Sequence, residues 1–353
     1  MKLIAFHLPQ FHPIPENSKW WGAGFSEWRN VANARPLFRG HQQPNLPEEL
    51  GFYDLRLEQT LIDQADLATW AGLSGFCYYH YWFAGRLLLE KPLELLLSNK
   101  TPDFPFCLCW ANHSWTAHWV GRNDMLIEQT YPGKEDHRAH YEYLRRFFND
   151  KRYIRINQKP LLLIFKPWDI PELEAFVNLI KAWALKDGLG GLHLVGLDNS
   201  KDLLKLGFDA IAPHGLNNIL KRYCSKKKNK FKLFLKYKVL RFPRWVVDYS
   251  ELLRLSDNFL CDGVTTIPTV IPNWDNTPRV GRKGVVLSGS SPEHFFAHLN
   301  DSIRGLDKAG QDSEKIVLIK SWNEWAEGNY LEPDLKYGRG WLAAVRSFLE
   351  TNN

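Results

Sequence analysis

Two glutamates near the end of the chain, Glu324 and Glu327, have the type and spacing of an acid–base pair. They follow an apolar run at residues 316–319, which is typical of a parallel strand that is covered on both faces. Active sites in such folds lie beyond the carboxyl ends of the strands. If the chain turns helically after Asn323, both carboxylates project to one side with Cβ atoms about 5–6 Å apart.

Two carboxyl groups this close cannot ionise equally, so one is held protonated as an acid and the other serves as base or nucleophile. A separation of about 5–5.5 Å between them is the arrangement of a retaining glycosidase. Trp322 and Trp325 could stack on sugar rings. The alternative is that Glu324 and Glu327 are solvated residues that open a helix and are stabilised by its dipole.

The composition is that of a globular protein, with 44% hydrophobic and 24% charged residues in 353. This length suits either two average domains or one large barrel. The 15 Trp, 13 Tyr and 21 Phe residues often stand beside His, Asn or Glu, which favours carbohydrate handling. Neither a nucleotide-binding glycine motif nor a serine nucleophile elbow is present, so no cofactor is expected.

The net charge of +6 is concentrated in one segment. Residues 210–247 contain no Asp or Glu, whereas Lys221 to Arg244 holds eleven Lys or Arg. This segment could contact an anionic polymer or a membrane surface, or it could be an ordinary solvated surface. Nucleic acid is not an expected partner, because no recognition motif accompanies the charge.

The five cysteines are an odd number without the spacing of a small disulfide scaffold, which favours reduced thiols in the cytoplasm. The first residues enter a strand pattern directly, without the pattern of a signal peptide, and no apolar stretch is long enough to cross a membrane. We therefore expect a cytoplasmic location, with peripheral contact to the inner membrane as an option.

Eight apolar or aromatic segments predict strands, and most of them end in polar or aromatic residues. They are Leu3–Leu8, Gly75–Trp82, Phe106–Trp110, Leu161–Phe165, Leu192–Leu197, Ala210–Ala212, Gly263–Ile271 and the run around Ile316. Helical spacing separates several of them, at Leu55–Trp70, Leu93–Leu97, Glu135–Phe148, Pro171–Lys186, Pro292–Ala309 and Trp341–Glu350. After the first strand, a long polar and aromatic segment is expected to be an active-site loop that precedes any helix.

This alternation predicts an α/β fold with a single (β/α)8 barrel, long loops after the strands and one domain over residues 1–353. The basic segment, approximately residues 217–250, is expected to be an insertion after strand six. The histidines near strand ends lack the spacing that fixes a metal site, so no metal is expected.

The candidate catalytic residues are Glu324 and Glu327. The residues expected to bind substrate stand at or near the ends of the predicted strands or in the long loop, and they are His12, Trp21, Glu27, Trp28, Tyr79, His80, Trp82, Trp110, Asn112, His214, Trp274, Asp275, Trp322 and Asn323.

Several segments together resemble the WbsX-like proteins of bacterial O-antigen and capsule gene clusters. The segments are Phe11–Asn17, Trp20–Gly22, Phe25–Trp28, Gly51–Leu55 and Trp322–Gly328. That group is similar in turn to glycoside hydrolase family 99, (β/α)8 enzymes that cleave α-mannosides internally with retention. This chain has Ala326 where those hydrolases often have His.

The resemblance implies that Glu324 deprotonates the 2-hydroxyl of the sugar and that Glu327 protonates the leaving oxygen. It suggests a retaining hydrolase, endo- or exo-acting, that cleaves α-mannoside-like or related linkages in bacterial surface polysaccharide. The alternatives are a glycosyltransferase of O-antigen or capsule biosynthesis and a non-catalytic glycan-binding protein.

Overall fold

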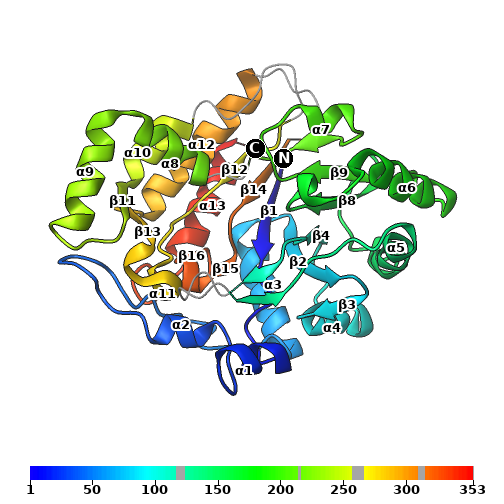
Figure 1. Cartoon of the computed structure of the whole chain (residues 1–353), viewed down its shortest axis with the longest axis horizontal. Coiled ribbons are helices and arrows are strands. Elements are labelled where there is room, and N and C mark those ends of the chain that lie inside the picture. Colours follow the sequence, from blue (N-terminus) through cyan, green and yellow to red (C-terminus); the bar gives the residue numbers. More distant parts are fainter. Residues whose placement is uncertain (117–123, 214–215, 257–265, 309–314, 353) are drawn as a thin grey trace.

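The structure is a computed structural model that describes residues 1–116, 124–213, 216–256, 266–308 and 315–352. Within these ranges, eight parallel strands form the central sheet, and each lies beside the next one along the chain (Figure 1). They are β1 (Lys2–His7), β2 (Gly75–Phe83), β4 (Phe106–Trp110), β8 (Lys159–Ile164), β9 (His193–Gly196), β10 (Ala210–Ile211), β12 (Thr269–Val270) and β14 (Ile316–Ile319).

The sheet closes on itself. At one side β1 pairs with both β2 and β14. At the other side Ile211 forms a parallel bridge with Thr266, and the Ile267 N–H donates to the Ile211 carbonyl at 2.8 Å. This arrangement confirms the predicted (β/α)8 barrel. The predicted seventh strand begins at Gly263, and residues 263–265 lie outside the described residues.

The strands are apolar because both of their faces are covered. Leu3, Ile4 and Ala5 of β1 are fully buried, as are the neighbouring side chains of β14. A strand that is buried on both faces consists of a continuous apolar run instead of an alternating one. The same rule explains Cys107 and Cys109 on β4, which are fully buried and pack as small apolar side chains.

Helices cover the outside of the barrel (Figure 1). They are α3 (Glu58–Ala71), α4 (Lys91–Asn99), α5 (Lys134–Phe148), α6 (Leu173–Lys186), α7 (Asp202–Lys205), α12 (Pro292–Lys308) and α13 (Gly340–Asn352). In α5, Tyr141, Leu144 and Phe148 recur at helical spacing on the buried face. Among the helices described, none is both long enough and apolar enough to traverse a lipid bilayer.

The segment after β1 contains two helices, so the expectation of a loop without helices was wrong. They are α1 (Pro15–Trp21), which begins at a proline, and α2 (Trp28–Ala32). Seven and five residues are too few for an apolar period to be visible in the sequence. The segment still carries side chains of the candidate site, because Trp21 ends α1 and Glu27 precedes α2.

Short elements complete the loops at the strand ends. The strands are β3 (Arg86–Leu88), β5 (Trp115–Thr116), β6 (Met125–Ile127), β7 (Arg155–Ile156), β15 (Asn323–Glu324) and β16 (Asn329–Tyr330). The helical turns are η2 (Pro167–Asp169), α11 (Thr277–Val280), η3 (Gly281–Lys283) and η4 (Trp325–Glu327).

The basic segment follows β10, at the position expected for the insertion. It folds into α8 (Leu216–Ser225), α9 (Lys227–Lys238), β11 (Trp245–Asp248) and α10 (Tyr249–Ser256). Strand β11 pairs in parallel with β13 (Val285–Ser288), which lies between β12 and β14 in the chain. A second hydrophobic cluster forms between these parts, and its buried members include Leu220, Tyr223, Leu233, Val247 and Leu287. That residues 1–353 form one domain stays a prediction.

Candidate active site

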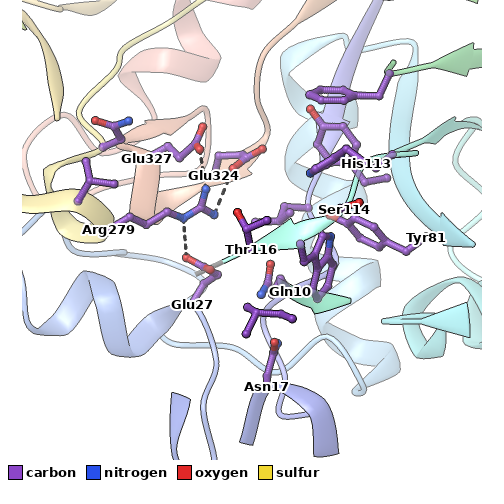
Figure 2. A pocket seen from close by; sticks show the side chains of 18 of the residues that line it. Gln10, Asn17, Glu27, Tyr81, His113, Ser114, Thr116, Arg279, Glu324 and Glu327 are labelled. Carbon is purple, nitrogen blue, oxygen red and sulfur yellow. Dashed lines mark hydrogen bonds and ion pairs between the residues drawn. The ribbon is translucent and has the colours of Figure 1, made fainter. Parts of the chain in front are cut away.

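A cavity of about 360 Å³ opens at the carboxyl ends of the barrel strands. Its wall includes Leu8 and Gln10 after β1, Tyr79 and Tyr81 from β2, and Phe165 after β8. The carboxyl end of the barrel is where the loops of this fold build active sites. Figure 2 shows the side chains that line this cavity.

Three carboxylates in this cavity converge on the guanidinium of Arg279 (Figure 2). Nη1 of Arg279 lies 2.5 Å from Oε1 of Glu327, and Nη2 lies 3.4 Å from Oε2 of Glu324. Nε of Arg279 donates to Oε2 of Glu27 at 3.1 Å. Arg279 belongs to α11, Glu27 precedes α2, and the other two glutamates follow β14. The cluster therefore joins three separate segments of the chain.

Lys320 supplies a second positive charge to the same carboxylates. Its Nζ lies 3.6 Å from Oε1 of Glu324 and 3.9 Å from Oε2 of Glu327. The ammonium also lies over the indole of Trp274, 5.3 Å from the ring centroid. Because Lys320 directly follows β14, the barrel strand itself sets its position.

Burial and like charge distinguish the two glutamates. Burial raises the pKa of Glu324, and the negative charge of Glu327 raises it further, while Lys320 and Arg279 oppose both effects. The side chain of Glu324 is 6% exposed and that of Glu327 is 19% exposed. Although burial works against it, the carboxylates of Glu27, Glu327 and Glu324 raise the pKa of Arg279. One glutamate is thus set deep in the wall with a raised pKa, and the other stands nearer the open space.

The chain between β14 and β16 is held by Asn323, which bridges to the end of β1. Its Oδ1 accepts the Leu8 N–H at 2.7 Å, and its Nδ2 donates to the Leu8 carbonyl at 3.1 Å. Glu324 follows directly, and η4 then carries the chain to Glu327. The sequence predicts that a helical turn brings the two glutamates together, and the turn is a 3₁₀ turn.

Glu332 anchors η4 through buried hydrogen bonds. It is fully buried and accepts hydrogen bonds from Trp325 Nε1 at 2.5 Å, Gln64 Nε2 at 2.7 Å and the Tyr53 hydroxyl at 2.9 Å. Burial raises the pKa of Glu332 to about 7, against the opposing effect of these donors. Its partners lie on η4, on α3 and in the loop after β1, so it ties the site to the outer layer.

Five of the residues expected at the site line this one cavity. They are Trp21, Glu27, Tyr79, Glu324 and Glu327. Two others, Trp274 and Asp275, line a neighbouring cavity of about 370 Å³. Asp275 accepts hydrogen bonds from His41 Nε2 at 2.7 Å and Gln43 Nε2 at 2.6 Å, and its N–H donates to the Glu327 carbonyl.

The other expected substrate-binding residues are not among those that line the first cavity. His12, Trp28, His80, Trp82, Trp110, Asn112, Trp322 and Asn323 are all buried. Most of them have partners within the protein: His80 Nε2 lies 2.9 Å from His140 Nε2, and Asn112 Nδ2 donates to the Lys166 carbonyl at 2.7 Å. Trp82 Nε1 donates to Asp136 Oδ1 at 3.0 Å. His214 lies outside the described residues. A sugar contact for any of these side chains stays a prediction.

Other cavity residues were not selected from the sequence. Arg279 and Lys320 contact the carboxylates, and Gln10, Asn17, Tyr81 and His113 form more of the polar wall. Arg279 is the last residue of the motif Trp-Asp-Asn-Thr-Pro-Arg, which follows a predicted strand. That position could have identified Arg279 as a candidate site residue. Burial and the charge of Lys166 lower the pKa of His113 to about 4, so its imidazole is neutral near pH 7.

Three polar groups in the cavity wall have no hydrogen-bond partner among the described residues. They are the side-chain amide of Asn17, the hydroxyl of Tyr79 and Nδ1 of His113, and each is buried. Buried polar groups nearly always have a partner, so groups without one at a cavity wall indicate a site for a polar ligand. Donors and acceptors beside the aromatic rings of Trp21, Trp115 and Phe165 match the hydroxyls and apolar faces of a sugar.

Known proteins with solved structures share this architecture. A chain described as a glycoside hydrolase-like protein has a TM-score of 0.62 at 15% identity, over 98% of this chain and 93% of that one. The family 99 endo-α-mannosidase of Bacteroides thetaiotaomicron has a TM-score of 0.60 at 15% identity, over 99% and 96% of the two chains. At this identity the likeness shows the fold.

Two relatives found by sequence have a much higher identity to this chain. The protein described as uncharacterized protein WxcX, from Xanthomonas campestris pv. campestris, is 39% identical over 350 residues, as is its counterpart from strain B100. The match covers 98% of this chain and 49% of each relative, so the chain spans about half their length. The family model described as glycosyltransferase WbsX matches residues 3–345. This chain, with a fold like that of glycoside hydrolases, therefore belongs to the WbsX family.

Proposed function

We propose that this chain is a retaining glycoside hydrolase in which Glu324 and Glu327 are the catalytic pair. The observation that carries the proposal is that both carboxylates stand in the wall of one open cavity and contact the same guanidinium. Their different burial supports a division of labour between them.

The proposed substrate is a glycan with α-mannoside-like or related linkages in a bacterial surface polysaccharide. Support comes from the unpartnered polar groups and aromatic rings of the wall, and from the resemblance to endo-acting family 99 enzymes. A cavity of about 360 Å³ is in the size range of small-molecule sites. The chain would hold one or two sugar units there, with the rest of the polymer outside.

In the first step, Glu324 takes the proton of the sugar 2-hydroxyl. The freed oxygen attacks the anomeric carbon and forms a 1,2-anhydro sugar, while the glycosidic bond breaks and its oxygen takes a proton from Glu327. The raised pKa of Glu324 suits the base, because a base is most effective when its pKa is near the working pH.

In the second step, water attacks the anomeric carbon and opens the anhydro ring. Glu327 takes the proton of the water, and Glu324 returns its proton to the 2-oxygen. Both residues regain their starting states, and two inversions at the anomeric carbon give net retention.

Arg279 sets a condition on this cycle. Its Nη1 lies 2.5 Å from Oε1 of Glu327, the residue that carries the proton of the first step, so this contact must open before Glu327 can reach the glycosidic oxygen. Arg279 can release Glu327 to the glycosidic oxygen and still hold Glu27 through Nε. We therefore assign Arg279 the role of positioning the acid.

A glycosyltransferase is the second candidate, and the family description favours it. Arg279 and Lys320 are cations in the cavity wall that could hold the phosphates of an activated sugar, although both already contact carboxylates. Isothermal titration with GDP and UDP separates the two functions, since tight binding would favour the transferase. A non-catalytic glycan-binding protein would instead bind an oligosaccharide without ever converting it.

Digestion of a panel of mannan and O-antigen oligosaccharides tests the hydrolase. We expect cleavage of at least one of them, and proton NMR should show that the first-formed product keeps the anomeric configuration of the substrate. An inverted product, or binding without cleavage across the panel, would contradict the proposal.

A further inference from the structure

Helix α9 presents apolar side chains to solvent. Phe231, Phe234 and Leu235 have the i, i+3, i+4 spacing of one helix face, and they are 66%, 56% and 43% exposed. Val239 and Leu240, just beyond the helix, are 64% and 56% exposed. Of the twelve large apolar side chains exposed among the described residues, these five fall within ten consecutive positions. Such a concentration marks an interaction surface instead of scattered surface residues.

Positive charge surrounds this apolar surface. Exposed cations flank it on the helix and on both sides of it, and they are Lys226, Lys227, Lys228, Lys230, Lys232, Lys238 and Arg241. The nearest acidic residues along the chain are Asp209 and Asp248. Burial and the charge of Lys232 lower the pKa of Lys236, against the opposing charge of Asp248. We call residues 226–241 the basic apolar patch.

The opposite face of α9 is anchored, so the patch has a defined orientation. Leu233 is buried in the second hydrophobic cluster. Arg282 Nη2 donates to the Tyr237 carbonyl at 3.1 Å, and its guanidinium lies over the Tyr237 ring. Because the inner face already packs on the protein, the phenylalanines cannot turn inward to complete a core.

The patch lies at the edge of the molecule, where α9 is the outermost helix at the left of Figure 1. It is connected to the candidate active site through a short path. Arg282, which holds Tyr237, stands three residues after Arg279 in the cavity wall. The segment 279–282 thus links α9 to the cavity wall.

We propose that the basic apolar patch docks this protein on an anionic lipid membrane. Lysines attract anionic headgroups, and Phe and Leu side chains enter the boundary between headgroups and acyl chains. An anionic polysaccharide would match the lysines but would leave the exposed phenylalanines without a role. The combination of the two therefore favours lipid, and the docked protein would act on glycans held at the membrane surface.

Co-sedimentation with vesicles tests the docking without any need for turnover. We expect binding to vesicles of equal parts phosphatidylglycerol and phosphatidylcholine, and little binding to phosphatidylcholine alone. The triple variant Phe231→Ala, Phe234→Ala, Leu235→Ala keeps the charges and good helix formers, and its partition coefficient should fall at least about 10-fold. The variant Lys227→Gln, Lys228→Gln, Lys230→Gln should fall by a similar factor or more, because each lysine near the surface contributes.

Matched control variants change the same residue types elsewhere. Leu57→Ala, Leu185→Ala, Leu335→Ala removes three exposed apolar side chains, and Lys91→Gln, Lys134→Gln, Lys186→Gln removes three exposed lysines. Both controls should bind vesicles like the unmodified chain. Glu324→Gln should also bind unchanged, so that a failure of docking is distinguished from a failure of the proposed hydrolase.

Two results would overturn the proposal. One is absence of binding to the anionic vesicles. The other is binding that an excess of soluble anionic polysaccharide abolishes and that the triple alanine variant retains in full, since the surface would then recognise a charged polymer.

Discussion

At the scale of single residues, Arg279 is the centre of the site. Three carboxylates from two segments of the chain meet its guanidinium, and without that charge they would repel one another in a poorly solvated wall. Arg279 also lowers the pKa of Glu324, against the larger effect of burial, which raises it.

Replacing Arg279 should therefore change the pH dependence of activity. The variant Arg279→Ala removes a positive charge that lowers the pKa of Glu324, so this pKa should rise further. Because the base must be ionised, the acidic limb of the kcat/KM profile should move to higher pH, and kcat should fall at least about 10-fold. A pH series with Arg254→Ala, an exposed arginine, as control measures the shift. A profile with an unmoved acidic limb would contradict the assignment.

Replacing Tyr79 should weaken substrate binding without lowering the stability of the protein. Its hydroxyl has no partner among the described residues, so Tyr79→Phe should leave the melting temperature almost unchanged. If the hydroxyl bonds substrate, KM should rise about 3- to 10-fold, the effect of one hydrogen bond. The control is Tyr153→Phe, which loses its bond to the Leu161 carbonyl and should be less stable. A marked loss of stability in Tyr79→Phe with an unchanged KM would argue against a sugar contact.

At the scale of elements, the turn η4 depends on a close approach to the segment that follows strand β12. Gly328 ends this turn with φ +51°, and a Cβ there would lie 2.8 Å from the backbone nitrogen and oxygen of Asp275. The glycine thus allows the segment with both glutamates to pack against the segment that leads to Arg279.

Gly328→Ala should accordingly lower the free energy of unfolding by much more than an ordinary glycine substitution does. Gly51 has a similar φ of +59°, but a Cβ at that position would meet nothing within 4 Å, so Gly51→Ala should cost about 1 kcal/mol for the backbone conformation alone. Gly328→Ala adds the collision and should cost at least about 3 kcal/mol. Denaturant unfolding of the two variants compares them, and equal costs would show that the close approach is absent.

Glu332 should make the attachment of η4 sensitive to pH. Its pKa is about 7 in the folded chain and 4.5 ordinarily, so the folded state binds more protons in this window. Its contribution to stability is therefore complete below about pH 4.5 and is lost as the pH rises through 7. Glu332→Gln cannot ionise, so between about pH 5 and 8 it should lose about 2 kcal/mol less stability than the unmodified chain. Unfolding at the two pH values, with exposed Glu350→Gln as control, measures the difference; equal losses in all three chains would refute it.

Most barrel strands could be predicted because they are apolar runs long enough to stand out between helical patterns, although β10 and β12 are only two residues long. The short elements could not. Helices α1 and α2 have no visible period, and β13 at Val285–Ser288 becomes a strand only by pairing with β11, about forty residues earlier in the chain. Pairings of this kind depend on the insertion folding against the barrel. The residue pattern of one segment does not reveal a partner strand so far away in the sequence.

At the scale of the whole molecule, the pairing of neighbouring barrel strands creates the site. Because β14 pairs with both β12 and β1, the loop after β12 lies beside the loop after β14, which places Arg279 against glutamates more than forty residues away. The sequence predicted that Glu324 and Glu327 lie close together because three residues of a turn suffice for it. It did not predict that both glutamates contact Arg279. It also did not predict that residues such as Trp110 and His80 are buried inside the protein. An aromatic or histidine at a strand end suits the core as well as a cavity.

The most direct test of the account is the rate of glycan cleavage by Glu324→Gln and Glu327→Gln. Each variant keeps the size of the side chain and removes its proton transfer, so both should fold like the unmodified chain and cleave at least about 100-fold more slowly. Glu135→Gln, an exposed glutamate in the first turn of α5, should cleave at the normal rate. An unchanged rate of cleavage in both Glu324→Gln and Glu327→Gln would contradict the central claim.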